Sequence, residues 1–143
     1  MGKKSPAQLP PVGGSETILL VEDDGQVRTL LLGVLQRAGY RVLDAPGPKE
    51  ALEKSLRHAG EIQLLITDIL MPKMSGLELA GAIVSLRPLT KILYVSGYTD
   101  DSFHLDEVAR DPLALLRKPV TPGALLQRVR DVLDRRFSSR PPP

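Results

Sequence analysis

Short apolar runs alternate with longer amphipathic segments along most of this chain, and this alternation limits the possible fold more than any other feature. Each run is as short as a buried strand, and most of the longer segments place apolar residues at the i, i+3, i+4 spacing of one helix face. Strands that alternate with helices predict a parallel sheet covered on both faces, because right-handed crossovers place helices on each side. The predicted strands are residues 17–21, 41–45, 62–66 with a continuation to 68, 91–95 and 113–116, and the predicted helices are 27 to Gly39, 48 to about 59, 77 to Pro88, about 100–109 and 121 onward.

The length of 143 residues and the hydrophobic content of 42% suit one domain with a single core. Aromatic residues make up only 3% of the chain, so Leu, Val, Ile and Ala must build that core. The two ends are rich in Pro and Ser and hold little to bury. We therefore expect a flexible linker or tail at 1–15, one folded domain at 16–137 and a disordered tail at 138–143.

Composition also argues against several functional classes. No stretch approaches the ~18 apolar residues of a membrane span, and the N-terminus lacks the apolar region of a secretory signal. The absence of Cys excludes disulfides, thiolate metal sites and Cys nucleophiles, and it fits a reducing cytoplasm. The net charge of +2 arises at the ends, because residues 16–134 hold 14 basic and 17 acidic residues, a balance of −3. A mildly acidic domain argues against direct binding of nucleic acid.

Polar side chains follow four of the predicted strands at their carboxyl ends, where parallel α/β sheets bind ligands. They are Glu22 and Asp23, Asp68, Ser96 and Lys118. Three carboxylates in one place repel one another, and a hard divalent cation such as Mg²⁺ relieves that repulsion. Asp is a known nucleophile toward phosphorus, and a lysine and a hydroxyl supply donors to phosphoryl oxygens. The set therefore suits phosphoryl transfer to a carboxylate.

Four motifs surround these strand ends, and in this order and spacing they resemble the receiver domain of bacterial response regulators over about residues 16–136. The resemblance implies a doubly wound (βα)5, flavodoxin-like α/β fold with a five-stranded parallel sheet in the order 2-1-3-4-5. The motifs are ILLVEDDGQVR at 18–28, LLITDILMPKMSG at 64–76, LYVSGY at 93–98 and LLRKP at 115–119.

The same resemblance assigns roles to the metal-binding and phosphoaccepting positions. Asp68 is then the phosphoacceptor, Asp23 ligates Mg²⁺ (or Mn²⁺) directly, and Glu22 does so directly or through water. The backbone carbonyl of Leu70 completes the protein ligands.

Four further positions have roles implied by the family pattern. Ser96 hydrogen-bonds the phosphoryl group, and Lys118 pairs with a phosphoryl oxygen. The bond from Lys118 to Pro119 is expected to be cis. Gly76 is expected to permit the tight turn that opens the third helix.

Two positions depart from the family pattern. Leu115 stands where an aromatic switch residue is common, which leaves a phosphorylation-independent adaptor as an alternative function. Leu70 stands where a polar residue can orient water, so we expect a long-lived aspartyl phosphate. A phosphohydrolase with an Asp nucleophile would carry its acid–base Asp at this same position, and Leu70 argues against that class.

As a receiver, the domain would take its phosphoryl group from a histidine kinase or a histidine phosphotransfer domain and would not be an enzyme in isolation. The residues around Ser15–Val21 and Ser96–Asp100 resemble those of the C-terminal receiver in hybrid sensor histidine kinases. A cytoplasmic location follows, with a parent kinase as a tether to the inner membrane and no membrane contact by the domain itself. A weak homodimer is left open.

Plainer roles are expected for three other polar residues. Asp24 precedes the first helix, where an N-cap or first-turn acid stabilises the helix, so we do not assign it to the metal. His58 and His104 have no partner at ligand spacing and are predicted to be surface residues.

Overall fold

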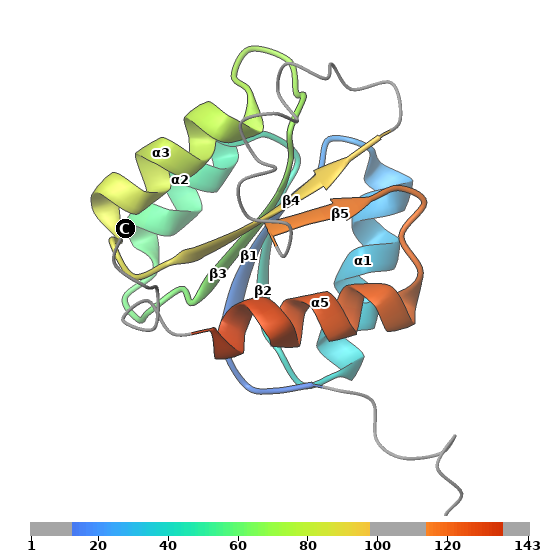
Figure 1. Ribbon diagram of the computed structural model, residues 1–143. Helices are drawn as coiled ribbons and strands as arrows, with labels where there is room; N and C mark the ends of the chain where they lie inside the picture. The colour runs from blue at the N-terminus through green and yellow to red at the C-terminus, as the bar shows by residue number, and fades with distance from the viewer. Residues whose placement is uncertain (1–12, 98–113, 136–143) are drawn as a thin grey trace, which may run out of the picture.

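The computed structural model describes residues 13–97 and 114–135, which form a parallel sheet between two layers of helices (Figure 1). All strand pairs are parallel, and the order β2-β1-β3-β4-β5 confirms the prediction. The strands are β1 (Thr17–Val21), β2 (Arg41–Ala45), β3 (Leu64–Asp68), β4 (Lys91–Ser96) and β5 (Leu115–Arg117).

The helices lie on both faces of the sheet, with α1 and α5 on one side and α2 and α3 on the other (Figure 1). None of the helices in the described residues is both long and apolar enough to cross a membrane. The helix predicted at about 100–109 lies outside those residues. The described helices are α1 (Gly25–Arg37), α2 (Pro48–Arg57), α3 (Gly76–Leu86) and α5 (Pro122–Asp134).

Four strand boundaries differ from the prediction. Two of the differences are small, because β4 ends at Ser96 and not at 95, and β5 begins at Leu115 and not at 113. The third strand was predicted from Ile62, but β3 begins at Leu64. Ile62 is buried, and its carbonyl accepts a hydrogen bond from the Thr90 hydroxyl at 2.6 Å. The apolar character of Ile62 therefore indicated that the residue is buried, but not that it belongs to the strand. The last strand was predicted to end at 116, whereas β5 continues to Arg117, whose backbone pairs with Ser96.

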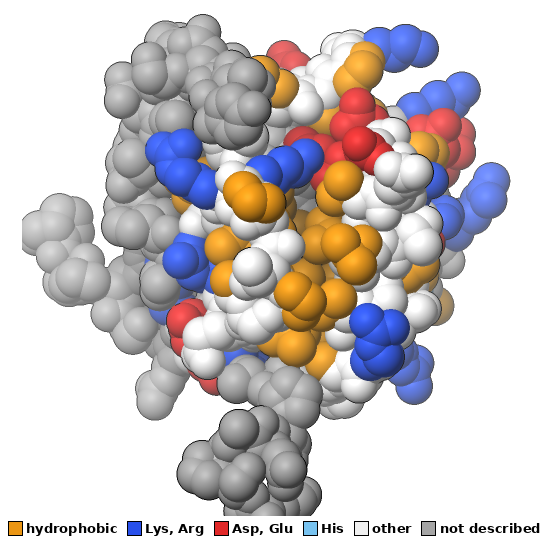
Figure 2. All heavy atoms as spheres, turned by 90° about the vertical axis from the view of Figure 1, so that its right-hand side faces the viewer, with side chains coloured by type: hydrophobic (Ala, Val, Ile, Leu, Met, Phe, Trp, Pro, Cys, Tyr) orange, Lys and Arg blue, Asp and Glu red, His pale blue; other side chains and the backbone are white. Residues whose placement is uncertain are grey.

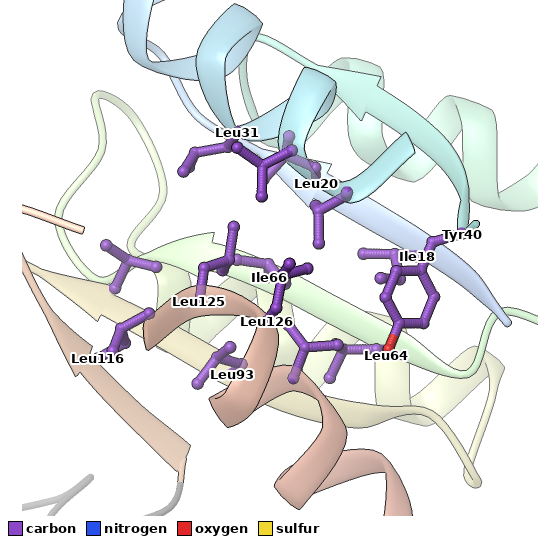
Figure 3. Packing of buried hydrophobic residues seen from close by; sticks show 14 of the residues in the cluster. Ile18, Leu20, Leu31, Tyr40, Leu64, Ile66, Leu93, Leu116, Leu125 and Leu126 are labelled. Carbon is purple, nitrogen blue, oxygen red and sulfur yellow. The ribbon is translucent and has the colours of Figure 1, made fainter. Parts of the chain in front are cut away.

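Two layers of branched aliphatic side chains form the core, as the low aromatic content predicts. One layer fills the space between the sheet and the helices α1 and α5, where residues of β1, β3 and β4 meet Leu31, Leu125 and Leu126 (Figure 3). The second layer lies between the sheet and the helices α2 and α3. The central strands β1 and β3 are buried along their whole length, which fixes the position of their carboxyl ends.

Helix α1 has a hydrogen-bonded cap at each end. Asp24 is its N-cap, with a side chain that accepts from the backbone N–H groups of Gln26 and Val27, so the predicted cap role is confirmed. At the other end Gly39 has a φ of 104°, and the Tyr40 N–H donates to the Leu35 carbonyl at 3.2 Å. This is a Schellman motif, and the left-handed backbone explains why glycine ends the helix.

Helix α2 was predicted to run to about residue 59 but ends at Arg57. The side chain of Arg87, which follows α3, replaces the next helical hydrogen bonds. Its guanidinium donates to the carbonyls of Ser55, His58 and Gly60, each at 2.8 Å, and to the Ser55 hydroxyl at 3.0 Å. A side chain from a distant part of the chain therefore ends this helix, and no local pattern in the sequence indicates it.

We expect Arg87→Met to lower the free energy of unfolding by about 2 kcal/mol, because three carbonyls and a buried hydroxyl lose their donor. Urea denaturation monitored by circular dichroism measures the change. Arg57→Met is the matched control, since Arg57 is exposed on α2, and it should change the stability by less than about 0.5 kcal/mol. Equal effects of the two substitutions would contradict this role of Arg87.

Candidate functional site

The carboxyl ends of the adjacent central strands β1 and β3 carry the predicted acidic residues. Asp68 is the last residue of β3, and Glu22 directly follows β1. The parallel register pairs Val21 with Thr67, so the two acidic residues emerge side by side at the same edge of the sheet. The fold thereby brings together residues that are 46 positions apart in the sequence.

Glu22, Asp23 and Asp68 form a compact carboxylate cluster in which one oxygen of each lies within 4.8 Å of the others. Glu22 is 1% exposed and Asp68 is 6% exposed, whereas Asp23 is open to solvent. Figure 2 shows acidic side chains gathered near the top of the face that carries α1 and α5, with hydrophobic side chains below them. The cluster combines two buried carboxylates with one that faces the solvent.

Lys118 enters this cluster from the end of β5. Its Nζ atom lies 3.2 Å from Asp68 Oδ1 and 3.4 Å from Glu22 Oε1. Partial burial disfavours the charged amine, but the nearby carboxylates of Asp68 and Glu22 outweigh this effect and raise the pKa of Lys118. The peptide bond from Lys118 to Pro119 is cis, as predicted.

The protein groups around Asp68 stabilise its carboxylate anion poorly. Burial, followed by the hydrogen bond and the charge of Glu22, raises its pKa to about 8 against the opposing effect of Lys118. One lysine is thus insufficient to compensate two buried carboxylates. The oxygen-rich donor set fits Mg²⁺, which prefers carboxylate oxygens and would supply the missing positive charge.

Ser96, the last residue of β4, lies fully buried at the same edge of the sheet. Asp68 pairs in register with Val95, so Ser96 stands one residue beyond the partner of Asp68. The Ser96 hydroxyl donates to the Gly97 carbonyl at 3.1 Å, and its own carbonyl accepts from the Lys118 N–H at 2.8 Å. Ser96 thus stands at the sheet edge that also carries Asp68 and the backbone of Lys118.

Leu70 lies two residues beyond Asp68 in the loop to α3, and its side chain is 41% exposed. This loop is held at both ends by backbone hydrogen bonds: Ile69 N–H donates to the Val95 carbonyl, and Gly76 N–H donates to the Ile69 carbonyl at 2.6 Å. Lys73, within the loop, has a φ of 76°, a left-handed conformation that is uncommon outside glycine. The loop is therefore closely tied to the strand end that carries Asp68.

Gly76 is required for a reason other than the predicted one. We expected it to permit a tight turn, but its φ is not positive. A Cβ atom at this position would lie 1.9 Å from the Asp68 carbonyl oxygen and 3.1 Å from Ile69 Cα. Glycine is needed because the start of α3 packs directly on the backbone of the candidate phosphoacceptor, a contact that only the tertiary structure reveals.

Arg28 belongs to the first motif, but the sequence indicated no function for it. Its Nη1 atom donates to the backbone carbonyl of Glu22 at 2.7 Å, and its Nε atom lies 3.4 Å from Asp44 Oδ2. An arginine one turn inside α1 is the only sequence signal, and such a residue is commonly a solvated surface charge. Only the folded chain shows that it reaches back to the acidic turn.

The other residues considered in the sequence lie away from the carboxylate cluster or outside the described part. Leu115 is half-buried on β5, in register with Tyr94 of β4. His58 is half-buried at the end of α2, where its carbonyl accepts from Arg87. His104 and the residues from Tyr98 to Asp100 lie outside the described residues.

Comparison with known proteins identifies relatives over most of the chain. The family model of the response regulator receiver domain matches residues 18–130. The chain is 35% identical over 124 residues to the sensor kinase CckA of Brucella abortus, covering 87% of this chain but only 13% of the kinase. It is also 35% identical over 102 residues to the response regulator receiver protein CpdR of the same organism, covering 71% of this chain and 83% of that protein.

Solved structures agree with these relatives. A CheY-like receiver domain protein from Methanospirillum hungatei matches with a TM-score of 0.72 and 30% identity, covering 85% of this chain and 95% of that one. The receiver domain of the hybrid histidine kinase CckA matches with a TM-score of 0.67 and 31% identity, covering 82% and 98% of the two chains. The fold and the order of its strands are therefore those of this group of structures.

Proposed function

This chain belongs to the family of response regulator receiver domains, and from that premise we propose that Asp68 accepts the phosphoryl group in a two-component phosphorelay. One observation carries the proposal: the Asp68 carboxylate lies in a cluster with Glu22 and Asp23 within 4.8 Å and has the Lys118 amine 3.2 Å away. A nucleophile, acidic ligands and a cationic donor thus share a single site.

The reaction we propose is attack by an Asp68 carboxylate oxygen on the phosphorus of a phosphohistidine. A P–O bond forms and the P–N bond breaks, and the imidazole nitrogen leaves with the electron pair. Lys118 and Ser96 would donate hydrogen bonds to the phosphoryl oxygens and so stabilise their negative charge. The 3.2 Å from Lys118 Nζ to Asp68 Oδ1, and the position of Ser96 one residue beyond the partner of Asp68, support these roles. No turnover is implied, because the acceptor itself becomes the product.

Glu22 and Asp23 would hold a Mg²⁺ ion together with Asp68, and the Leu70 carbonyl would complete the protein ligands. When bound, the ion would supply positive charge to the carboxylates and to the phosphoryl oxygens. The chain itself keeps Asp68 nearly inaccessible to solvent and Asp23 exposed, so a cation would reach the site from the side of Asp23.

We propose a histidine kinase or a histidine phosphotransfer domain as the donor. The similarity to the CckA receiver supports a hybrid-kinase type of receiver, and a cytoplasmic location fits that class, although the chain spans only 13% of that kinase.

Incubation with phosphorylated donor proteins and Mg²⁺ tests the proposal. Label should move to this chain, should be released by hydroxylamine as expected of an acyl phosphate, and should stay on the donor when EDTA is present. Transfer that is insensitive to EDTA would overturn the metal-dependent function.

Leu70 predicts a slow loss of the phosphoryl group. Leu70 is 41% exposed two residues beyond Asp68, and its side chain has no group that can orient a water molecule. We expect Leu70→Asn to shorten the half-life of the aspartyl phosphate several-fold, measured as loss of label after removal of the donor. Leu70→Met, which is also apolar, should keep the half-life of the wild type. An unchanged half-life in Leu70→Asn would show that this side chain does not limit hydrolysis.

A further inference from the structure

We propose that Arg28 is a positioning residue that fixes the backbone carrying the Asp23 carboxylate, and so sets the affinity of the site for a divalent cation. The inference rests on the proposed function, because it concerns the same Mg²⁺ site. The Arg28 side chain leaves the first turn of α1 and reaches back to the backbone of Glu22, directly after β1.

Both peptide groups that flank Asp23 are held by hydrogen bonds. The carbonyl of the Glu22–Asp23 peptide accepts from Arg28 Nη1 at 2.7 Å, and the N–H of the Asp23–Asp24 peptide donates to Glu22 Oε2 at 3.1 Å. These two peptide planes fix the φ and ψ angles of Asp23, and hence the direction in which its side chain leaves the backbone. Asp23 is exposed, and within the described ranges the structure gives its carboxylate no hydrogen bond of its own.

Arg28 is in turn oriented by the neighbouring strand. Its Nε atom lies 3.4 Å from Asp44 Oδ2 near the end of β2, and its side chain is only 22% exposed. The residue after Asp44 holds the same turn, because the Ala45 carbonyl accepts from the Glu22 N–H at 3.1 Å. Two contacts therefore link the acidic turn to the end of β2: the side-chain contact of Arg28 with Asp44 and the backbone hydrogen bond from Glu22 to Ala45.

If Arg28 acts through its charge, its neutralisation should change the Mg²⁺ affinity in one direction; if Arg28 acts by positioning Asp23, the change should be in the opposite direction. A guanidinium beside a cation site repels the cation, so a purely electrostatic role predicts tighter Mg²⁺ binding when Arg28 is neutralised. A positioning role predicts weaker binding, because Mg²⁺ demands nearly ideal ligand geometry and groups that orient metal ligands typically matter about tenfold or more for affinity.

The experiment measures the Kd of Mg²⁺ by titration of the backbone amide chemical shifts near residues 23 and 68. We expect Arg28→Met to raise the Kd about tenfold, and Arg28→Lys, which keeps the charge but loses the planar fork, to raise it as well. Asp44→Asn should raise it by a smaller factor. Arg37→Met removes the same charge from the exposed last turn of α1 and should leave the Kd within about twofold of the wild type, since an exposed charge at that distance is largely screened.

Unchanged or tighter Mg²⁺ binding by Arg28→Met would overturn the proposal. Urea denaturation of each variant shows whether the fold is retained, and if Arg28→Met does not fold, an unchanged Kd in both Arg28→Lys and Asp44→Asn overturns it instead. Failure of the wild-type protein to bind Mg²⁺ would refute the metal site itself, and this result is distinct from binding that is equal in wild type and variants.

Discussion

Asp68→Asn is expected to abolish phosphorylation of this receiver domain, with no label transferred from an acyl phosphate or from a phosphohistidine donor. The substitution keeps the shape of the side chain but removes the anionic oxygen that attacks phosphorus. Intact-protein mass spectrometry after incubation with the donor and Mg²⁺ measures the result. Asp24→Asn is the matched control, because Asp24 lies beside the site as the N-cap of α1 and Asn caps equally well. Label on Asp68→Asn at the level of this control would refute Asp68 as the acceptor.

The same substitution should stabilise the metal-free fold at neutral and alkaline pH. Burial and Glu22 raise the pKa of Asp68 from 3.8 to about 8, so the native state retains a proton that the unfolded chain has already lost over this range. Native stability therefore decreases as the pH rises from about 4 to about 8, and the neutral Asn side chain avoids this loss. We expect Asp68→Asn to be more stable than the wild type by up to roughly 4 kcal/mol at pH 7, with a smaller difference at pH 5.

Urea denaturation in EDTA at pH 5 and pH 8 measures this difference. Saturating Mg²⁺ should reduce the advantage of Asp68→Asn, because the cation stabilises the wild-type carboxylate in the native state only. A difference between the two proteins that is the same at both pH values would show that Asp68 does not carry the raised pKa. That outcome would leave its role as phosphoacceptor to the labelling experiment.

Gly76→Ala is expected to be strongly disruptive although it adds only one methyl group. Its Cβ would lie 1.9 Å from the Asp68 carbonyl oxygen, far inside van der Waals contact, and the obstacle is backbone that cannot rotate away. We expect a loss of about 3 kcal/mol of unfolding free energy, together with a large decrease in the rate of phosphorylation, because α3 and the strand end must separate. Urea denaturation and the labelling rate from an acyl phosphate measure the two effects.

Gly81→Ala provides the matched control on the same helix. Gly81 is exposed in the middle of α3, and a Cβ there would meet nothing within 4 Å. Replacing an unconstrained helical glycine by Ala should stabilise the protein by about 0.5–1 kcal/mol and leave phosphorylation unchanged. If Gly76→Ala behaved like Gly81→Ala, the close packing of α3 on the Asp68 backbone would be wrong.

The sequence alone predicted most of the architecture, because periodicity is a local property of the chain. The apolar run 17–21 is buried as its pattern predicts. The helical stripe of Val27, Leu30, Leu31, Val34 and Leu35 was predicted as one buried face; Leu31, Val34 and Leu35 are buried, whereas Leu30 is 55% exposed. The same signal misplaced the start of β3, since Ile62 is buried without belonging to the strand. The apolar pattern thus predicted the positions of the strands and helices well, but their first and last residues less well.

The acidic cluster and its lysine were also predictable, because parallel strands bring their carboxyl ends to one edge and the four motifs resemble one family. The strand order came from that resemblance and not from periodicity. The functions of Arg28, Gly76 and Arg87 were not predictable in the same way. Each contacts backbone atoms of another segment. Because every residue type has these backbone atoms, the amino-acid sequence of that segment does not indicate the contact.

The amino-acid sequence by itself thus determined which elements form, which residues stand at the strand ends and which family the chain resembles. The tertiary structure decided the distances among these residues, the burial that raises the pKa of Asp68, and the residues that hold the site in place. The physical reason is that the spacing of hydrophobic residues is a property of neighbouring positions in the sequence. Electrostatic coupling and close packing instead depend on how segments that are distant in sequence meet in the folded chain.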